Sequence, residues 1–402
     1  MAEIFVIFAL FLTGSFLSFA KADESVAKAT KNLPHNAYYY YLKALNVRRQ
    51  AARTNVTSPP SPPDTKRTSR QNPKPYKKNA AEIKADAETL EIIRKGFSFT
   101  YKKPNHDETQ DFSHRMSPFV DMFLNESDTK AKKGDWRGAA GCALDAVRLV
   151  QDMTHGTILD VLLGNINLSI ARKKFKQVLE NGDISTIRMV INRLENIFAQ
   201  QVQYADVLQA EKENGLSFYH EIAANPNWRN EFKKDDPFLP TQNIDSLKKV
   251  YINAMDDLIT NARLPYPQRK VSISVPGDAI NQMQLALFSS PKYLNSGMTQ
   301  GTPLANQQTK SAFFLVEFAL RAYQLEHHQY PQTLEELVPN YLHKIPDDPF
   351  AANQPLRYID NKETYVLYSI GPDGIDNGGK QIDNKRIYAD SKGDIVSEVQ
   401  NW

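Results

Sequence analysis

Residues 311–331 read SAFFLVEFALRAYQLEHHQYP, and they open the part of the chain that decides the fold. Their apolar residues recur at helical spacing up to the pair Tyr330-Pro331, where proline stops a helix. Two short segments rich in tyrosine and β-branched residues follow, at 357–359 and 364–368, with Asp-Asn-Lys between them. These patterns predict a helix packed on a small antiparallel sheet joined by a tight turn.

The order of these segments resembles the C-terminal globular domain of the type II secretion major pseudopilins. The resemblance rests on the helix, on Tyr330-Pro331, on the sequence IPDDPF at 345–350, on the strands, and on YSIGPDG at 368–374. It implies a pilin-like α+β domain over residues 304–402. The whole chain also looks like large bacterial envelope proteins in which a helical region precedes such a domain.

In the pseudopilin family the loop after the last strand binds calcium, and Asp373 matches the aspartate of its Gly-x-Asp-Gly motif. Asp376 and Asp383 lie in the same glycine-rich loop, and calcium takes six to eight oxygen ligands. The resemblance therefore implies a possible calcium site at Asp373, Asp376 and Asp383, with no other cofactor. The alternative is a turn in which Asp373 caps backbone amides, because Lys380 interrupts the family's pattern.

A second departure concerns the place of this domain in the chain. Pseudopilins begin with a cleaved leader and a long hydrophobic helix that assembles the filament, whereas here some three hundred residues of other sequence precede the domain. We therefore interpret the chain as a stand-alone user of the pilin-like domain.

Composition sets broad limits on the function. The chain has 402 residues, of which 41% are hydrophobic and 24% charged, which is typical of a globular protein with two or three domains. The net charge of +3 is nearly balanced, so nothing calls for a nucleic-acid partner. The single cysteine, Cys142, lies in an alanine-rich helical stretch and is expected in the core.

The amino-terminal sequence predicts export. Ile4–Phe19 is apolar and is followed by Ala20-Lys21-Ala22, a small-x-small pattern that suits signal peptidase. We expect a signal peptide at 1–22 and a location in the periplasm or cell envelope. An uncleaved inner-membrane anchor at 4–19 is the alternative.

Composition also divides the rest of the chain. Residues 23–52 read as a short helical segment, whose tyrosines at 38–41 either pack on the domain behind or form a carbohydrate platform. Residues 53–79 are rich in proline and lysine and predict a disordered linker, or a basic tether to an anionic membrane surface.

Residues 80–263 predict an all-α domain of antiparallel helical hairpins, similar to a degenerate tetratricopeptide array. The pairs Gly134-Asp135 and Gly182-Asp183 are expected to turn the chain and to cap the next helix. Residues 264–303 predict an irregular connector, with a strand near 271–275 and a short helix at 279–287. The fold class expected is a mostly helical scaffold followed by a small C-terminal α+β domain.

The sequence holds no clear catalytic motif. The acidic pairs Glu335-Glu336 and Asp347-Asp348 could serve a glycosidase, but their positions favour solvated structural roles. We therefore expect a non-catalytic structural or protein-interaction role in the envelope, with a protein partner. An envelope hydrolase with an unrecognised active site and an accessory component of type II secretion are the alternatives.

Overall fold

The computed structural model describes residues 35–54, 80–103, 112–224, 244–270, 300–383 and 387–397. The chain separates into two compact units, Met1–Met122 and Phe123–Trp402. The expected signal peptide at 1–22, nearly all of the expected linker at 53–79, and the expected strand and helix within 271–287 lie outside the described residues.

In the first unit α3 (Ala37–Thr54) packs on α4 (Ala80–Gly96), and its tyrosines contact aromatic rings of the segment that follows α4. Tyr38 and Tyr41 are buried, and their rings contact those of Tyr101 and Phe112. Two of the four consecutive tyrosines thus form core, as their packing interpretation predicts. Helix α5 (Phe112–Ala131) begins in this unit.

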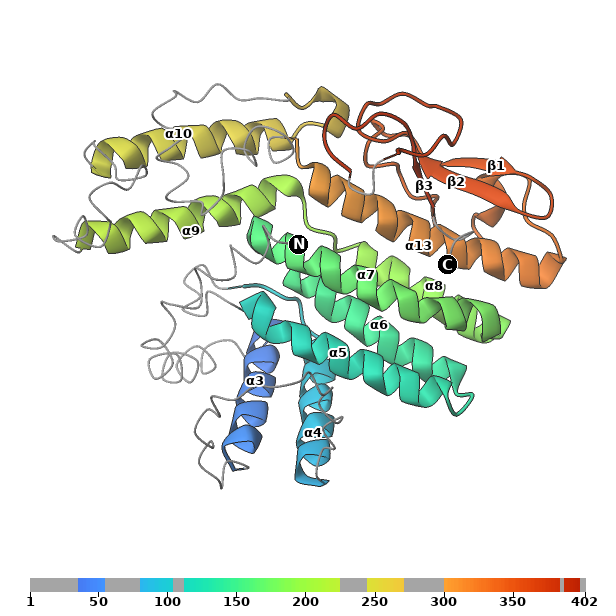
Figure 1. Ribbon diagram of the computed structural model, residues 1–402, viewed down its shortest axis with the longest axis horizontal. Helices are drawn as coiled ribbons and strands as arrows, with labels where there is room; N and C mark the ends of the chain where they lie inside the picture. The colour runs from blue at the N-terminus through green and yellow to red at the C-terminus, as the bar shows by residue number, and fades with distance from the viewer. Residues whose placement is uncertain are drawn as a thin grey trace, which may run out of the picture. The chain divides into compact units, whose positions relative to one another are not determined.

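The second unit is a set of packed helices followed by a small sheet (Figure 1). Helix α6 packs on α7 and α8, and α9 packs on α10. The elements in order are α6 (Trp136–Met153), α7 (Ile158–Asn181), α8 (Ile184–Phe198), α9 (Tyr204–Ala224), α10 (Ile244–Ala262), the 3₁₀ turn η3 (Tyr266–Gln268), α13 (Thr302–His327) and the 3₁₀ turn η4 (Leu334–Leu337). The expectation of a mostly helical scaffold is therefore confirmed.

The two Gly-Asp pairs act as predicted. Gly134 adopts a positive φ of 76°, and the side chain of Asp135 accepts a hydrogen bond from the Gly138 amide at 2.8 Å at the start of α6. Asp183 accepts one from the Thr186 amide at 2.8 Å at the start of α8. Each cap satisfies an amide that the helix leaves unpaired and contributes about 1 kcal/mol.

Helix α13 lies between helices α7 and α8 on one side and strand β2 on the other (Figure 1). Its Phe314 and Phe318 rings meet Phe175 of α7 edge to face, at centroid distances of 4.8 and 5.8 Å. The boundary expected before residue 304 therefore does not separate α13 from the helical array, because α13 shares a core with both the array and the sheet.

The sheet contains β1 (Arg357–Asp360), β2 (Tyr365–Ser369) and β3 (Ile395–Val396), in that order. Both pairings are antiparallel, with Ile359 opposite Val366 and Ser369 opposite Ile395. The predicted hairpin is confirmed, whereas the pairing of β3 was not predicted. The protein is thus mostly helical with a small antiparallel sheet near its C-terminus. Among the described helices, none combines the length and apolar character that a bilayer span requires.

Candidate functional site

Asp373, the residue matched to the pseudopilin calcium loop, closes a backbone turn. One of its carboxylate oxygens accepts a hydrogen bond from the Ile375 amide at 3.1 Å, and the other accepts one from the Gly393 amide at 3.0 Å. The second bond joins the loop after β2 to the segment before β3. This geometry is that of the amide-capping alternative.

Asp376 also forms hydrogen bonds and an ion pair within the protein. Its Oδ1 accepts hydrogen bonds from the Gly378 amide and the Tyr368 hydroxyl, both at 3.0 Å, and its Oδ2 lies 3.3 Å from Nε of Arg357. The Gly378 amide is the main cause that lowers the pKa of the Asp376 carboxyl, and Tyr368 and Arg357 add to it. The side chain is therefore held ionised by a local network.

Asp383, the third expected ligand, is exposed. Within the part of the chain that the structure describes, no three His, Cys, Asp or Glu side chains converge as a metal ion would need.

Asp394 organises the loop and was not singled out from the sequence. Its side chain is fully buried and accepts hydrogen bonds from the amides of Asn377 and Gly379, the latter at 2.7 Å. Burial raises the pKa of its carboxyl, and these amide bonds oppose the rise. A signal was available, since Gly393-Asp394 repeats the Gly-Asp pair that turns the chain at 134–135 and 182–183.

The expectation that Asp348 is solvated is wrong. Asp348 is only 1% exposed, and burial raises the pKa of its carboxyl. Its oxygens accept hydrogen bonds from the Ser369 hydroxyl at 2.6 Å and from the amides of Phe350 and Ile370. The residue ties the loop at 346–350 to the end of β2 and has the surroundings of a structural carboxylate.

Helix α7 carries a row of aliphatic side chains that face solvent. Leu159, Leu162, Ile166 and Ile170 are 46%, 41%, 54% and 39% exposed. Their spacing of three, four and four residues places them on one side of the helix, and we call this row the α7 stripe. The sequence predicts the helix, whereas the exposed row was not predicted.

A sequence signal for the stripe existed. The core side of α7 is already filled by Val161, Leu168 and Phe175, which recur at intervals of seven. The four stripe residues are additional, so α7 has more apolar side chains than one buried face needs. Large aliphatic side chains gathered at a surface mark interaction sites more often than chance scatter does.

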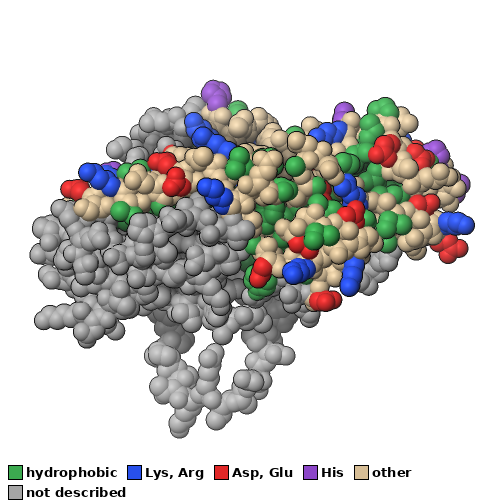
Figure 2. All heavy atoms as spheres, turned by 90° about the horizontal axis from the view of Figure 1, so that it is seen from above, with side chains coloured by type: hydrophobic (Ala, Val, Ile, Leu, Met, Phe, Trp, Pro, Cys, Tyr) green, Lys and Arg blue, Asp and Glu red, His purple; other side chains and the backbone are tan. Residues whose placement is uncertain are grey.

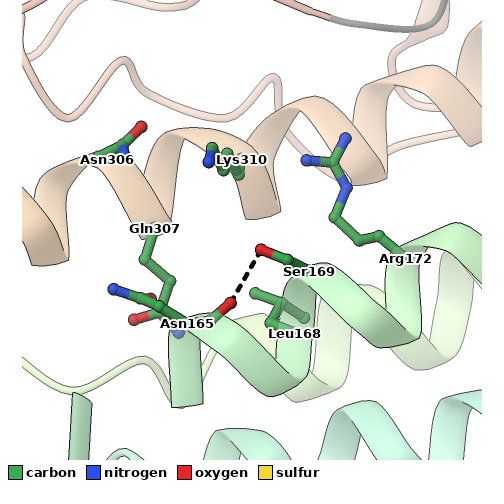
Figure 3. A pocket seen from close by; sticks show the side chains of 7 residues that line it. All are labelled: Asn165, Leu168, Ser169, Arg172, Asn306, Gln307 and Lys310. Atoms are coloured by element: carbon green, nitrogen blue, oxygen red, sulfur yellow. Dashed lines mark hydrogen bonds between the residues drawn. The ribbon is translucent and has the colours of Figure 1, made fainter. Parts of the chain in front are cut away.

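A polar pocket lies beside the stripe, between α7 and α13 (Figure 3). It encloses about 50 Å³. Its lining comes from Asn165, Leu168, Ser169 and Arg172 of α7 and from Asn306, Gln307 and Lys310 of α13.

Three side-chain amide oxygens at this pocket are buried without a hydrogen-bond partner: Asn165 Oδ1, Asn306 Oδ1 and Gln307 Oε1. Gln307 is only 6% exposed, and in Figure 3 its side chain extends from α13 toward Asn165. The amide nitrogen of Asn165 donates to the carbonyl of Pro303 at 3.4 Å, which orients this side chain. Buried acceptors without donors are rare in folded proteins, because their desolvation is not compensated.

Two positively charged side chains line the pocket, Arg172 and Lys310. Arg172 lies 3.5 Å from Glu317, a carboxylate only 1% exposed. The Ser397 hydroxyl donates to the other oxygen of Glu317, which joins α7, α13 and the end of β3. Lys310 adds a further positive charge at the pocket wall.

One face of the molecule shows no single sign of charge over the described residues. On the face drawn in Figure 2, Lys and Arg side chains are interspersed with Asp and Glu over the described residues. This agrees with the nearly balanced net charge of +3.

Comparison with protein families, with curated proteins and with solved structures finds no match to this chain. What the protein does must therefore follow from its own residues.

Proposed function

We propose that this chain is a non-catalytic, exported protein of the bacterial envelope that binds a protein partner on the α7 side of its helical array. The observation that carries this proposal is the α7 stripe, four large aliphatic side chains on one helix face that are each between 39% and 54% exposed. Covering such side chains by a partner is favourable, since fully burying one contributes roughly 1.5–3 kcal/mol.

The C-terminal α+β part serves as a support for this surface in the proposed role. Nη2 of Arg188 on α8 donates to both carboxylate oxygens of Glu326 on α13, at 2.9 Å each. Glu195 of α8 contacts the imidazole of His343 at 2.7 Å. The first contact joins α13 to α8, and the second joins the segment after η4 to the same helix.

The envelope location and the pilin-like character of the C-terminal part are supported by the sequence. The signal-like residues 1–22 support export, and the resemblance of residues 311–383 to the pseudopilin globular domain supports work near the inner membrane.

The test is an affinity purification of the tagged full chain from the cells that make it. The proteins recovered with each variant are compared. The wild type, an Ile166→Ser/Ile170→Ser variant and an Ile83→Ser control are used, because Ile83 is 58% exposed on α4, outside the stripe. The proposal expects one partner to be recovered with wild type and control but lost with the double variant. Equal recovery with all three proteins would rule out the stripe as the binding surface.

Calcium binding by the C-terminal loop is a separate proposal. It is supported by the pseudopilin resemblance and by the oxygen-rich stretch that contains Asp373, Asp376 and Asp383. An ion would have to replace the amide donors that Asp373 and Asp376 now hold.

Thermal unfolding of the full chain with and without calcium tests this proposal. A site requires that calcium raise the melting temperature of wild type and not that of Asp373→Asn, since a ligand that binds only the folded state stabilises it. No shift in wild type removes the proposal.

A further inference from the structure

One edge of the sheet is formed by β1, which among the described strands pairs only with β2 (Figure 1). In an antiparallel pair, the backbone N–H and C=O groups of alternate residues point toward the partner strand, and those of the residues between point away. The outward groups of an edge strand are a template on which another extended chain pairs. The residues of β1 that point outward therefore decide what this edge offers.

The hydrogen bonds of the neighbouring strands fix this direction. The Ser397 amide donates to the carbonyl of Leu367 at 2.8 Å, so Leu367 directs its backbone groups toward β3. The residues on either side of it in β2 therefore direct theirs toward β1, where they lie opposite the odd-numbered residues of that strand. It follows that the backbone groups of the even-numbered residues, Tyr358 and Asp360, point away from the sheet.

The chain itself pairs with this edge just before β1, and that pairing stops at a proline. The Leu356 amide donates to the carbonyl of Pro346 at 3.3 Å, and Asp347 forms an antiparallel bridge with Pro355. A continued ladder would need an N–H at residue 346 for the carbonyl of Leu356, and proline has none. The open part of the edge therefore begins at the carbonyl of Leu356 and continues along β1.

The outward groups of β1 have no partner within the part of the chain that the structure describes. No hydrogen bond from outside the sheet reaches the backbone of Tyr358 or Asp360 there. The Tyr358 hydroxyl donates to the carbonyl of Pro331 at 2.8 Å, so this side chain is held on one face of the sheet. On the opposite face the side chain of Ile359 is 38% exposed. The edge thus offers backbone donors and acceptors beside an aliphatic side chain.

An extended chain is the ligand whose chemistry matches this edge. It carries N–H and C=O groups at about the 3.3 Å per residue of a strand, and it adds to a sheet as a new edge strand. Cross-strand neighbours favour opposite charges and apolar pairs. Oδ1 of Asp360 accepts from the Lys362 amide at 2.7 Å, whereas Oδ2 has no donor among the described residues. A basic residue therefore fits opposite Asp360, and an apolar residue next to it fits opposite Ile359.

We infer that the open edge of β1 binds an extended segment of a partner protein as a fourth strand. The segment runs antiparallel to β1, the direction that residues 346–347 already take on this edge. It places a lysine or arginine opposite Asp360 and an apolar residue opposite Ile359. This site shares no residue with the α7 stripe, so the inference goes beyond the proposed function and fails or stands independently of it.

The experiment selects peptides from a random library displayed on phage, using the full chain as bait. The most enriched peptide is synthesised with a fluorescent label, and its affinity is measured by anisotropy. We expect enriched sequences in which a basic residue adjoins an apolar one. A library that yields no binding peptide would overturn the inference.

Peptides methylated at one backbone nitrogen each then report how the segment binds. Methylation should abolish binding at alternate residues and leave it unchanged at the residues between, because only every second N–H of the added strand points toward β1. Losses of affinity that do not alternate in this way would mean that the peptide does not add to the sheet, and the inference fails.

A matched pair of variants locates the site. Asp360→Pro blocks the edge without removing a bond of the sheet, because the amide that proline lacks points outward. Its melting temperature should be close to that of Asp360→Ala, since both lose the same side chain. We expect Asp360→Ala to weaken peptide binding up to about fivefold, through the lost charge pair. Asp360→Pro should weaken it about a further tenfold, the effect of one lost hydrogen bond.

The remaining outcomes separate this inference from the proposed function. Equal affinity of the peptide for wild type and Asp360→Pro would show that it binds elsewhere, which overturns the inference. If such a peptide also loses its affinity for Ile166→Ser/Ile170→Ser, it binds the α7 stripe and supports the proposed function alone. If Asp360→Pro melts well below Asp360→Ala, the alternation among the methylated peptides decides the question.

Discussion

At the scale of single residues, Asp348 uses both of its carboxylate oxygens inside the C-terminal part. Oδ1 accepts from the Ser369 hydroxyl and the Phe350 amide, and Oδ2 accepts from the Ile370 amide at 2.9 Å. These donors belong to the proline-rich loop and to the end of β2. One buried side chain therefore fixes the loop to the sheet.

Replacing Asp348 by alanine should lower the free energy of unfolding by about 1–3 kcal/mol or more, because buried donors lose their acceptor. The measurement is urea unfolding of the full chain, with Asp347→Ala as the control. Asp347 is the exposed neighbour, and its carboxylate pairs only with Lys344 among the contacts of the described residues. Equal losses in the two variants would argue against the special role of Asp348.

The stability should also depend on pH through this residue. Burial raises the pKa of the Asp348 carboxyl above its ordinary value, so the folded state holds this proton more tightly than the unfolded state does. The contribution is present at low pH and is lost as pH rises from about 4, the ordinary aspartate pKa, through the raised folded value.

Asp348→Asn removes this titration and supplies the comparison. The wild-type free energy of unfolding, relative to that of Asp348→Asn at the same pH, should fall as pH rises across this window. A difference that is flat or grows with pH would mean that the carboxyl is not held protonated by burial.

Residue roles were only partly predictable from the sequence. The helix caps Asp135 and Asp183 follow from local chemistry, because the acceptor and the amide lie three residues apart. Asp348 and Asp394 depend on partners 15 to 22 residues away, such as Ile370 and Gly379. Periodicity carries no information about which distant amide a carboxylate will meet.

At the scale of elements, α13 decides how the second unit holds together. Phe314 is fully buried, and its ring contacts those of Phe175, Phe198 and Phe318 at centroid distances of 4.8 to 6.5 Å. The Nε of Arg321 donates to the carbonyl of Leu179 at 3.0 Å, near the end of α7. The helix is thus a core element of the array and the base of the sheet.

Phe314→Ala should therefore destabilise both parts together. The expected loss is about 3–5 kcal/mol, the usual cost of a large cavity in a core. Amide hydrogen exchange in α8 and in β2 should accelerate in parallel. Acceleration confined to β2 would mean that the C-terminal part opens independently of the helical array.

The helices and the β1–β2 hairpin follow from the sequence, because periodicity and turn residues act locally. The place of α13 between two layers does not. Nearly all of its residues from 302 to 323 are buried. A sequence that is apolar over such a length predicts a buried helix but not which elements pack against it. The α7 stripe differs from α13 in that its apolar side chains remain exposed to solvent.

At the scale of the whole molecule, we propose that the second unit works mainly through one surface. The α7 stripe gives an apolar strip, the pocket beside it gives unpaired acceptors, and α13 fixes the wall between the array and the sheet. Covering the apolar side chains of the strip and pairing the acceptors of the pocket would both be favourable in free energy. The exposure of the α7 stripe is the physical reason to expect a partner there.

The most direct measurement places a photoreactive benzophenone amino acid at Ile166 of the full chain, in the cells that make the protein. Ile83, which is 58% exposed on α4, receives the same group as the control. We predict one crosslinked partner from position 166, none from position 83, and loss of the adduct when Ile170→Ser is added. No adduct at position 166, or the same adducts from both positions, would contradict the claim that the α7 stripe is a partner-binding surface.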